Sequence, residues 1–404
     1  MTKTRDVAIV GVGQVPWGVY PDKSPEQLGV EALLAALKNA NMHWREIQSI
    51  VAGPAHFISE KGGMSSLLTA TSVEFLMGGI GLPVANIANA CATSMSLIKE
   101  GFVQIASGYH DVVAVMAVDK SAGGFFRPQS RDGKYDLDYK RYVMVGETNP
   151  SYWAMEARRR MHDCGTTEED LAMVKVVTSR ASLDNPNTRY KKLYTKEEVL
   201  ASPMVCDPLH LFEICSTSDG AAVLLITSLD NAAKYTKKPI VIEGVAVATS
   251  YFGDQTIPLF NLSTFPQKGV PALSESRASL KAVYKMANKK PSDIDIIELP
   301  DNSSWHYLAY LDMILDLNHG EAEKLLRKGD TDPISGKIPV CTGGGADASG
   351  ESVAAQGLYF VCEAVEQLRQ EAGKRQVKKD AKVALAQTYG YAGNNSACII
   401  SRGW

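Results

Sequence analysis

The order of strands and helices repeats within this chain, and this repetition limits the possible folds more than any other feature. The first half predicts a strand at DVAIVGVGQVP (6–16), a capped amphipathic helix over 24–42 and a strand at 47–53. The second half predicts a strand at 239–250, followed by a helix, a turn and a strand over 274–301. Alternating strands and amphipathic helices are typical of layered α/β architecture.

Each half continues in the same way. A strand at 82–90 leads into a helix over 93–107 and a strand at 111–120. Later in the chain, a long helix over 352–373 precedes a strand at 382–390. The repeated order indicates an internal duplication, visible as a pattern of elements rather than as sequence identity. Chance similarity between two α/β halves is the alternative.

A different kind of segment separates the halves. It holds Gly-Gly, several Arg and Tyr, and two helical stretches, TTEEDLAMVKVVTSR and TKEEVLAS. A long insertion on an α/β core commonly supplies binding surface. We therefore expect an N-terminal half over 1–120 that is completed by 213–235, an inserted loop domain over 121–212, and a C-terminal half over 236–404.

Composition excludes several classes of protein. The 404 residues exceed the length at which one hydrophobic core stops growing. A net charge of −3 gives no electrostatic footprint for nucleic acid or an anionic membrane. There is no apolar run long enough for a membrane span, and the N-terminus is typical of a first strand rather than of a signal peptide. We expect a cytoplasmic protein that binds neither nucleic acid nor membranes.

The seven cysteines point to one reactive position. Their number is odd and none forms a CxxC pair, which argues against a disulfide scaffold and against a zinc site in this chain. Cys91 lies in NACATSMSLI, where a strand turns tightly into a helix. A helix N-terminus lowers a thiol pKa, and its free N–H groups can hold a developing oxyanion. The alternative is a buried structural cysteine.

NACATSMSLI resembles the active-site cysteine segment of the thiolase superfamily, in particular of archaeal-type and sterol-carrier-like thiolases. RRRMHDCGTTEEDLAMV (158–174) and LASPMVCDPLHLFEICSTSDGAAVLLI (200–226) are similar to the family's loop domain and to the end of its first half. The resemblance covers essentially the whole chain. It implies an α/β thiolase fold, in which two duplicated βαβαβαββ halves form a five-layered α-β-α-β-α body with an inserted loop domain.

The resemblance also implies an activity and partners. Cys91 is expected to take an acyl group from a thioester and pass it to coenzyme A, which makes the chain an acyl-CoA C-acyltransferase. Backbone N–H groups of Cys91 and Tyr391 are the expected oxyanion hole. Related thiolases imply a homodimer core and a small partner subunit with a zinc ribbon and an oligonucleotide-fold-like (OB-fold-like) domain. Any zinc would then enter with that partner, and this chain would hold no metal.

Departures from the family pattern concern the acid–base groups. The family has a histidine in a Gly-His-Pro segment, and spacing within CTGGGADASGESVAAQG (341–357) places Asp347 there. ELPDNSSWHYL (298–308) supplies Asn302, a candidate oxyanion or water holder, and His306. Tyr389 stands where many members have a second cysteine. We rank His306 first as the base, because an imidazole titrates near neutral pH.

Asp347 requires burial to act as a base, and Tyr389 suits hydrogen-bond donation. The alternatives are a helix-capping Asp347, an exposed His306 and a packing Tyr389.

The overall pattern most resembles the larger subunit of the benzoylsuccinyl-CoA thiolases of anaerobic toluene degradation. This predicts cleavage of (S)-2-benzoylsuccinyl-CoA with coenzyme A to benzoyl-CoA and succinyl-CoA. Arg127, Arg131 and Arg141 are candidates for binding the free carboxylate. The alternatives are a thiolase-fold retro-aldolase, which uses tyrosines in place of the cysteine, another acyl-CoA condensing enzyme, and a non-catalytic acyl-CoA-binding scaffold.

Overall fold

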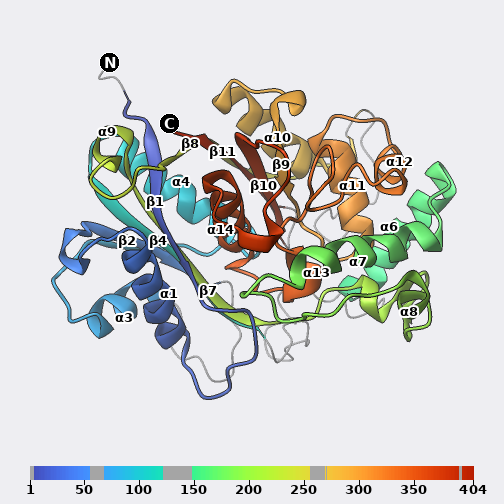
Figure 1. Cartoon of the computed structure of the whole chain (residues 1–404), viewed down its shortest axis with the longest axis horizontal. Coiled ribbons are helices and arrows are strands. Elements are labelled where there is room, and N and C mark those ends of the chain that lie inside the picture. The colour runs from blue at the N-terminus through green and yellow to red at the C-terminus, as the bar shows by residue number, and fades with distance from the viewer. Residues whose placement is uncertain (1–3, 55–67, 122–147, 255–268, 270, 391–393) are drawn as a thin grey trace.

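A nine-stranded sheet forms the centre of the molecule (Figure 1). The computed structural model describes residues 4–54, 68–121, 148–254, 269, 271–390 and 394–404. In chain order, the strands of this sheet are β1 (Val7–Gln14), β2 (Ser49–Gly53), β3 (Val84–Asn86), β4 (Val112–Lys120), β7 (Asp219–Ser228), β8 (Ile240–Thr249), β9 (Ile296–Glu298), β10 (Val383–Gly390) and β11 (Asn394–Arg402).

The strand order, β3-β2-β4-β7-β1-β8-β11-β10-β9, is mirrored about the contact between β1 and β8, except that β3 is an additional edge strand on the β1 side. On one side β1 pairs antiparallel with β7, β7 antiparallel with β4, and β4 parallel with β2. On the other side β8 pairs antiparallel with β11, β11 antiparallel with β10, and β10 parallel with β9. The same pairing sequence on both sides confirms the predicted duplication. The seam is short, since it joins only Ala8 to Val241 and Ile9 to Ile240.

Two helices form a layer between the half-sheets. α4 (Thr93–Ala106) and α14 (Gln356–Arg369) pack against each other, and each contacts strands of both halves. The outer face of the first half is covered by α1 (Pro25–Asn39) and α3 (Thr69–Leu76), and that of the second half by α10 (Ser274–Ala287). This arrangement is the expected five-layered body of a thiolase fold.

Alternation along β1 shows why its first four residues are all apolar. Val7 and Ile9 belong to the central core with α4 and α14, whereas Ala8 and Val10 belong to the core beneath α1. All four side chains are fully buried. A strand covered on both faces has no place for polar residues.

The helix after β1 begins where the sequence predicts. Ser24 caps α1: its Oγ accepts a hydrogen bond from the Gln27 N–H at 3.2 Å, and the Gln27 side chain accepts one from the Ser24 N–H at 2.8 Å. Pro25 occupies the first helical position, where a missing N–H costs nothing.

The described part of the insertion between β4 and β7 contains the helices α6 (Asn149–Cys164), α7 (Glu168–Ser182) and α8 (Lys196–Leu200). Figure 1 shows α6 and α7 beside α11 (Ser304–Ile314) and α12 (Ala322–Arg327). α7 packs on α11, α12 and α13, and α6 packs on α11. The predicted domain boundaries stay a proposal, which the return of β7 to pair with β1 and β4 supports. The remaining described elements are η1 (Trp44–Glu46), β5 (Met204–Cys206), β6 (Leu209–His210), η2 (Leu211–Glu213), α9 (Leu229–Ala232), η3 (Pro291–Asp293), α13 (Gly345–Ser349) and η4 (Gly373–Arg375).

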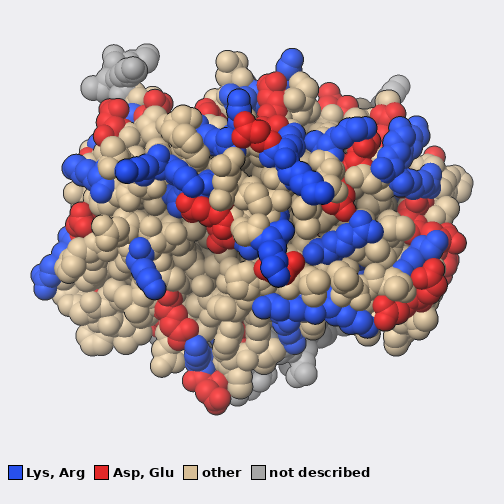
Figure 2. All heavy atoms as spheres, viewed as in Figure 1, with Lys and Arg blue, Asp and Glu red and all other residues tan. Residues whose placement is uncertain are grey.

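Basic and acidic side chains are interspersed over the face in Figure 2, in keeping with the net charge of −3. In the described parts of the chain, no helix combines the length and apolar character that crossing a membrane requires.

Candidate active site

Cys91 lies in the turn that joins β3 to α4. Ala90 takes a left-handed backbone conformation with φ of 46°. The Thr93 N–H then donates to the Ala90 carbonyl at 3.0 Å, and the Thr93 Oγ1 accepts from the Asn89 N–H at 2.7 Å. The Cys91 side chain is only 6% exposed. The predicted strand, tight turn and helix around this cysteine are therefore present.

Glu351 faces Cys91 from the other half of the molecule. The Cys91 thiol donates a hydrogen bond to Glu351 Oε1, with 3.0 Å between sulfur and oxygen. Sequence analysis missed this residue, because spacing counted from the glycine run led to Asp347 instead. A usable signal was present: Gly350-Glu351-Ser352 lies just before α14, in the same setting as the family's Gly-His-Pro segment.

Backbone hydrogen bonds hold Glu351 in place. Its N–H donates to the Ser216 carbonyl at 2.6 Å, and its carbonyl accepts from the Ser218 N–H at 2.8 Å. Gly350 has φ of 80°, and a Cβ there would lie 2.3 Å from Ser218 Oγ. Only glycine suits a position that combines a left-handed φ with this close approach. With the backbone of Gly350 and Glu351 held in this way, α14 begins only at Gln356, and the Glu351 side chain points toward Cys91.

The electrostatics of Glu351 suit proton transfer near neutral pH. Burial raises its pKa from 4.5 to about 7, and the charge of Asp119 acts in the same direction. Hydrogen bonds from Cys91, Asn302 and Cys215 oppose this shift. A carboxyl group with such a pKa can accept and return a proton at working pH.

Two amides complete the surroundings of Glu351. Asn302 Oδ1 accepts a hydrogen bond from Gln356 Nε2 at 3.2 Å, and both side chains are buried. Asn302 also hydrogen-bonds Glu351. The structure thus brings the predicted Asn302 together with Cys91 through Glu351.

Asp347 does a different task from the predicted one. Lys175 Nζ lies 3.1 Å from its Oδ1, and Thr178 Oγ1 donates to its Oδ2 at 2.8 Å. Burial raises the pKa of Asp347, while Lys175 and Thr178 lower it. Its carboxylate ties α13 to α7. The prediction that Asp347 takes the place of the family's histidine is corrected, since Glu351 contacts the cysteine.

His306 is fully buried, and its Nδ1 lies 2.8 Å from Ser303 Oγ. Burial lowers its pKa to about 3, so the imidazole stays neutral at physiological pH. The expectation that it titrates near neutral pH is wrong, and so is the alternative of an exposed ring. Its ring packs against Trp305, with centroids 4.5 Å apart, and against Tyr389 at 5.4 Å. Tyr389 thus packs against α11, and hydrogen-bond donation by its hydroxyl group stays a prediction.

Four other predicted residues, Arg127, Arg131, Arg141 and Tyr391, lie outside the described residues.

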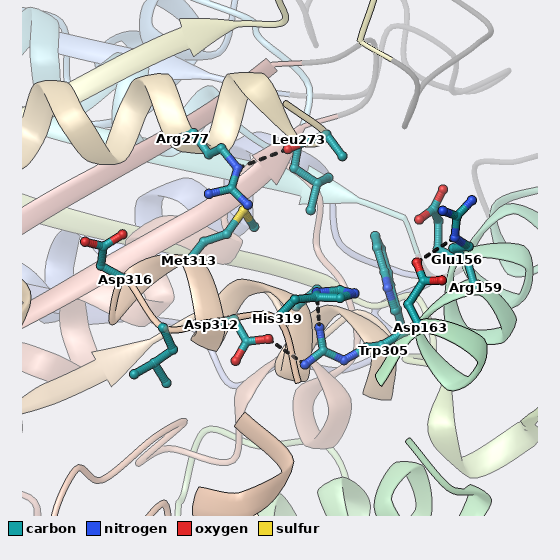
Figure 3. Close-up of a pocket in the computed structure, with 14 residues that line it drawn as sticks. Glu156, Arg159, Asp163, Leu273, Arg277, Trp305, Asp312, Met313, Asp316 and His319 are labelled. Carbon is teal, nitrogen blue, oxygen red and sulfur yellow. Dashed lines mark hydrogen bonds and ion pairs between the residues drawn. The ribbon is translucent and has the colours of Figure 1, made fainter. Parts of the chain in front are cut away.

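A cavity of about 290 Å³ opens between α6, α10 and α11, and none of its lining residues is Cys91 or Glu351 (Figure 3). Arg160 in its wall forms ion pairs with Asp312 at 2.6 Å and Glu323 at 2.7 Å. Trp305 separates the cavity from His306 by ring packing. This cavity is therefore distinct from the cysteine site. The described residues hold no group of three or more His, Cys, Asp or Glu arranged to bind a metal.

Comparisons with known proteins agree with this architecture. Residues 263–402 match the family model of a thiolase C-terminal domain. The chain is 31% identical over 398 residues to the acetyl-CoA acetyltransferase of Methanothermobacter thermautotrophicus, covering 98% of this chain and 99% of that protein. It is 27% identical over 398 residues to benzoylsuccinyl-CoA thiolase subunit BbsB of Thauera aromatica, covering 96% of each.

Two solved structures share the fold. The Ltp2-ChsH2(DUF35) aldolase superposes with a TM-score of 0.82 at 24% identity, over 99% of each chain. Human mitochondrial 3-ketoacyl-CoA thiolase in complex with CoA gives 0.71 at 19% identity, over 98% of each chain.

Mirrored half-sheets around two central helices, with a cysteine at the start of the first helix, define a thiolase-fold protein. The chain belongs to the thiolase family. It is an acyltransferase that acts on acyl-CoA, and coenzyme A is a substrate in this family.

Proposed function

We propose that the chain cleaves a β-ketoacyl-CoA with coenzyme A, using Cys91 as the nucleophile and Glu351 as the acid–base group. The observation that carries this proposal is the 3.0 Å contact between Cys91 Sγ and Glu351 Oε1 in a buried site. A thiol that donates to a buried carboxyl group is the arrangement that activates a nucleophile, and this pairing favours an enzyme over a non-catalytic scaffold.

In the proposed reaction, Glu351 accepts and returns the proton at each step. Its carboxylate takes the Cys91 proton, and the thiolate attacks the β-keto carbonyl. The bond between the α- and β-carbons breaks, its electron pair stays on the α-carbon, and Glu351 returns the proton there. Glu351 next takes the proton of the coenzyme A thiol, whose sulfur attacks the acyl thioester. Cys91 leaves as a thiolate and recovers a proton from Glu351.

Asn302 and Gln356 position this carboxyl group. Their mutual hydrogen bond orients the Asn302 amide toward Glu351. The expected oxyanion donors, the N–H groups of Cys91 and Tyr391, stay part of the proposal.

The narrower substrate proposal is (S)-2-benzoylsuccinyl-CoA, which would yield benzoyl-CoA and succinyl-CoA. Its support is the relation to BbsB at 27% identity. The Methanothermobacter acetyl-CoA acetyltransferase at 31% identity makes acetoacetyl-CoA the competing substrate. The partner proposal is a homodimer that binds a small DUF35-type subunit, supported by the Ltp2-ChsH2(DUF35) assembly. A zinc ribbon and an OB-fold-like domain are expected in that subunit, and zinc is not expected in this chain.

Intact-mass measurement tests the activity. The purified chain is incubated with benzoylsuccinyl-CoA or acetoacetyl-CoA, without free coenzyme A, and the mass of the trapped acyl group is read on Cys91. A benzoyl adduct supports the narrower proposal, whereas an acetyl adduct replaces it. If neither substrate, nor longer β-ketoacyl-CoA esters, labels Cys91, the acyl-enzyme proposal fails. Cys91→Ser is the matched control for labelling at other thiols.

A further inference from the structure

The carboxyl group of Glu351 lies between two thiols. Its Oε1 is 3.0 Å from Cys91 Sγ, and its Oε2 is 3.9 Å from Cys215 Sγ. The second contact is long, but it is within the range of a thiol donor, because sulfur is larger and a weaker donor than nitrogen or oxygen. The two oxygens of one carboxylate thus accept from two different cysteines.

The backbone fixes Cys215 in this place. Its N–H donates to the Asn302 carbonyl at 2.9 Å, which anchors it beside the amide that also contacts Glu351. The next residue, Ser216, accepts the Glu351 N–H. Moving Cys215 away from Glu351 would therefore break the backbone hydrogen bonds that place the Glu351 carboxyl group against Cys91.

Burial and the nearby carboxyl groups keep the Cys215 thiol protonated. Burial raises its pKa well above the ordinary value, and the carboxyl groups of Glu351, Asp301 and Asp347 act in the same direction. A thiol that keeps its proton is a permanent hydrogen-bond donor. That donation lowers the pKa of Glu351, against burial and the charge of Asp119.

We propose that Cys215 is a positioning residue, whose thiol holds Oε2 of Glu351 so that Oε1 faces Cys91 while the proton passes between them. This rests on the proposed role of Glu351 as the acid–base group. The moving proton leaves Cys91 Sγ, whose electron pair stays on sulfur, and forms a bond to Oε1. Cys215 keeps its own proton throughout.

The test is the pH dependence of Cys91 alkylation by iodoacetamide, followed by peptide mass on the full-length chain. The Cys91–Glu351 pair loses its first proton as a unit, so alkylation should rise through a midpoint set by both groups. Cys215→Ala removes a donor to the charged form, and the midpoint should move upward by roughly half to one pH unit. Cys215→Ser keeps a donor and should stay near the wild-type midpoint.

Cys398→Ala is the matched control, because Cys398 is a fully buried thiol whose pKa is raised by burial alone. It should leave the midpoint unchanged. The proposal is overturned if Cys215→Ala also leaves it unchanged, or if Cys215→Ser shifts it as far as Cys215→Ala does. An equal shift in Cys215→Ser and Cys215→Ala would mean that the packing of the Cys215 side chain, and not hydrogen-bond donation, sets the midpoint.

Alkylation requires no acyl-CoA, so this test separates the inference from the proposed reaction. A shifted midpoint in a chain that cleaves no β-ketoacyl-CoA supports the positioning role and refutes the proposed reaction. If Glu351→Gln alkylates with the wild-type profile, both the acid–base pair and the role of Cys215 fail.

Discussion

Cys91 and Glu351 are 260 residues apart in the chain, yet their sulfur and carboxylate oxygen lie 3.0 Å apart. Cys91 belongs to the predicted N-terminal half, and Glu351 belongs to the predicted C-terminal half. The proposed nucleophile and the proposed acid–base group therefore meet only when the two half-sheets and their central helices have docked.

Replacing Cys91 with serine should remove the acyl-enzyme. Serine has a similar size but is far less acidic, so the packing is kept while the thiolate is lost. We expect turnover to fall on the order of 10³-fold or more, with an unchanged melting temperature. Cys206→Ser, a half-buried thiol in β5, should keep full activity. Activity of Cys91→Ser within about tenfold of wild type would refute covalent catalysis.

Replacing Glu351 with glutamine should lower turnover by roughly 10²–10⁴, the usual span for loss of a general acid–base group. The wild-type rate should also show a limb near pH 7 that the variant lacks, since the pKa of Glu351 is about 7. His306→Ala and Asp347→Asn serve as comparison variants. The folded fraction of each should keep the wild-type pH profile of turnover. A normal Glu351→Gln beside an inactive His306→Ala would return the acid–base role to the imidazole.

The same carboxyl group should make stability depend on pH. Its pKa is about 7 in the folded chain and near the ordinary 4.5 when unfolded, so the folded state binds more protons between these values. The stability gained by burying the neutral acid is present below pH 4.5 and is lost as pH rises through 7, up to about 3 kcal/mol. Glu351→Gln avoids this loss. Its melting temperature relative to wild type should rise between pH 5 and 8, and a constant difference would contradict the raised pKa.

Alanine at Gly350 should displace Glu351. A Cβ there would meet Ser218 Oγ at 2.3 Å, in addition to the strain of a left-handed φ. Gly329 is the matched control, with φ of 72° and no atom within 4 Å of an added Cβ. Gly329→Ala should lose about 1–2 kcal/mol of stability from its left-handed φ. Gly350→Ala should lose more, because φ of 80° with ψ of 150° is a conformation that essentially only glycine adopts. Only Gly350→Ala should also lower turnover, by more than about tenfold. Equal activities would mean that the contact with Ser218 does not set the position of Glu351.

The sequence was sufficient for local structure around Cys91. A strand, a tight small-residue turn and a helix follow from periodicity within some twenty residues, and Ser24 and Pro25 mark the start of α1 in the same way. Periodicity could not identify Glu351, because the direction of its side chain depends on backbone hydrogen bonds to Ser216 and Ser218, more than a hundred residues earlier. The only sequence signal was the similarity of Gly350-Glu351-Ser352 to the family's Gly-His-Pro segment.

His306 shows the converse limitation. Residue type predicts an ordinary imidazole pKa, but its burial among the rings of Trp153, Trp305 and Tyr310 is set by tertiary packing. Periodicity along α11 gives no indication that every residue of this helix is buried. The sequence does not reveal the burial of His306, and burial determines whether its imidazole carries a charge.

The mirrored sheet has a consequence for how this site can change over evolutionary time. Cys91 precedes α4 and Glu351 precedes α14, so each stands ahead of the central helix of its own half. Duplication of an ancestral half would have supplied two copies of that position, whose side chains lie 3.0 Å apart in this chain. In this chain one copy holds the thiol of Cys91, the proposed acyl carrier, and the other holds the carboxyl group of Glu351, where the family pattern has an imidazole. Under the proposed function, substitution at the second position would change the pH at which the enzyme works, while the thiol at the first position is retained.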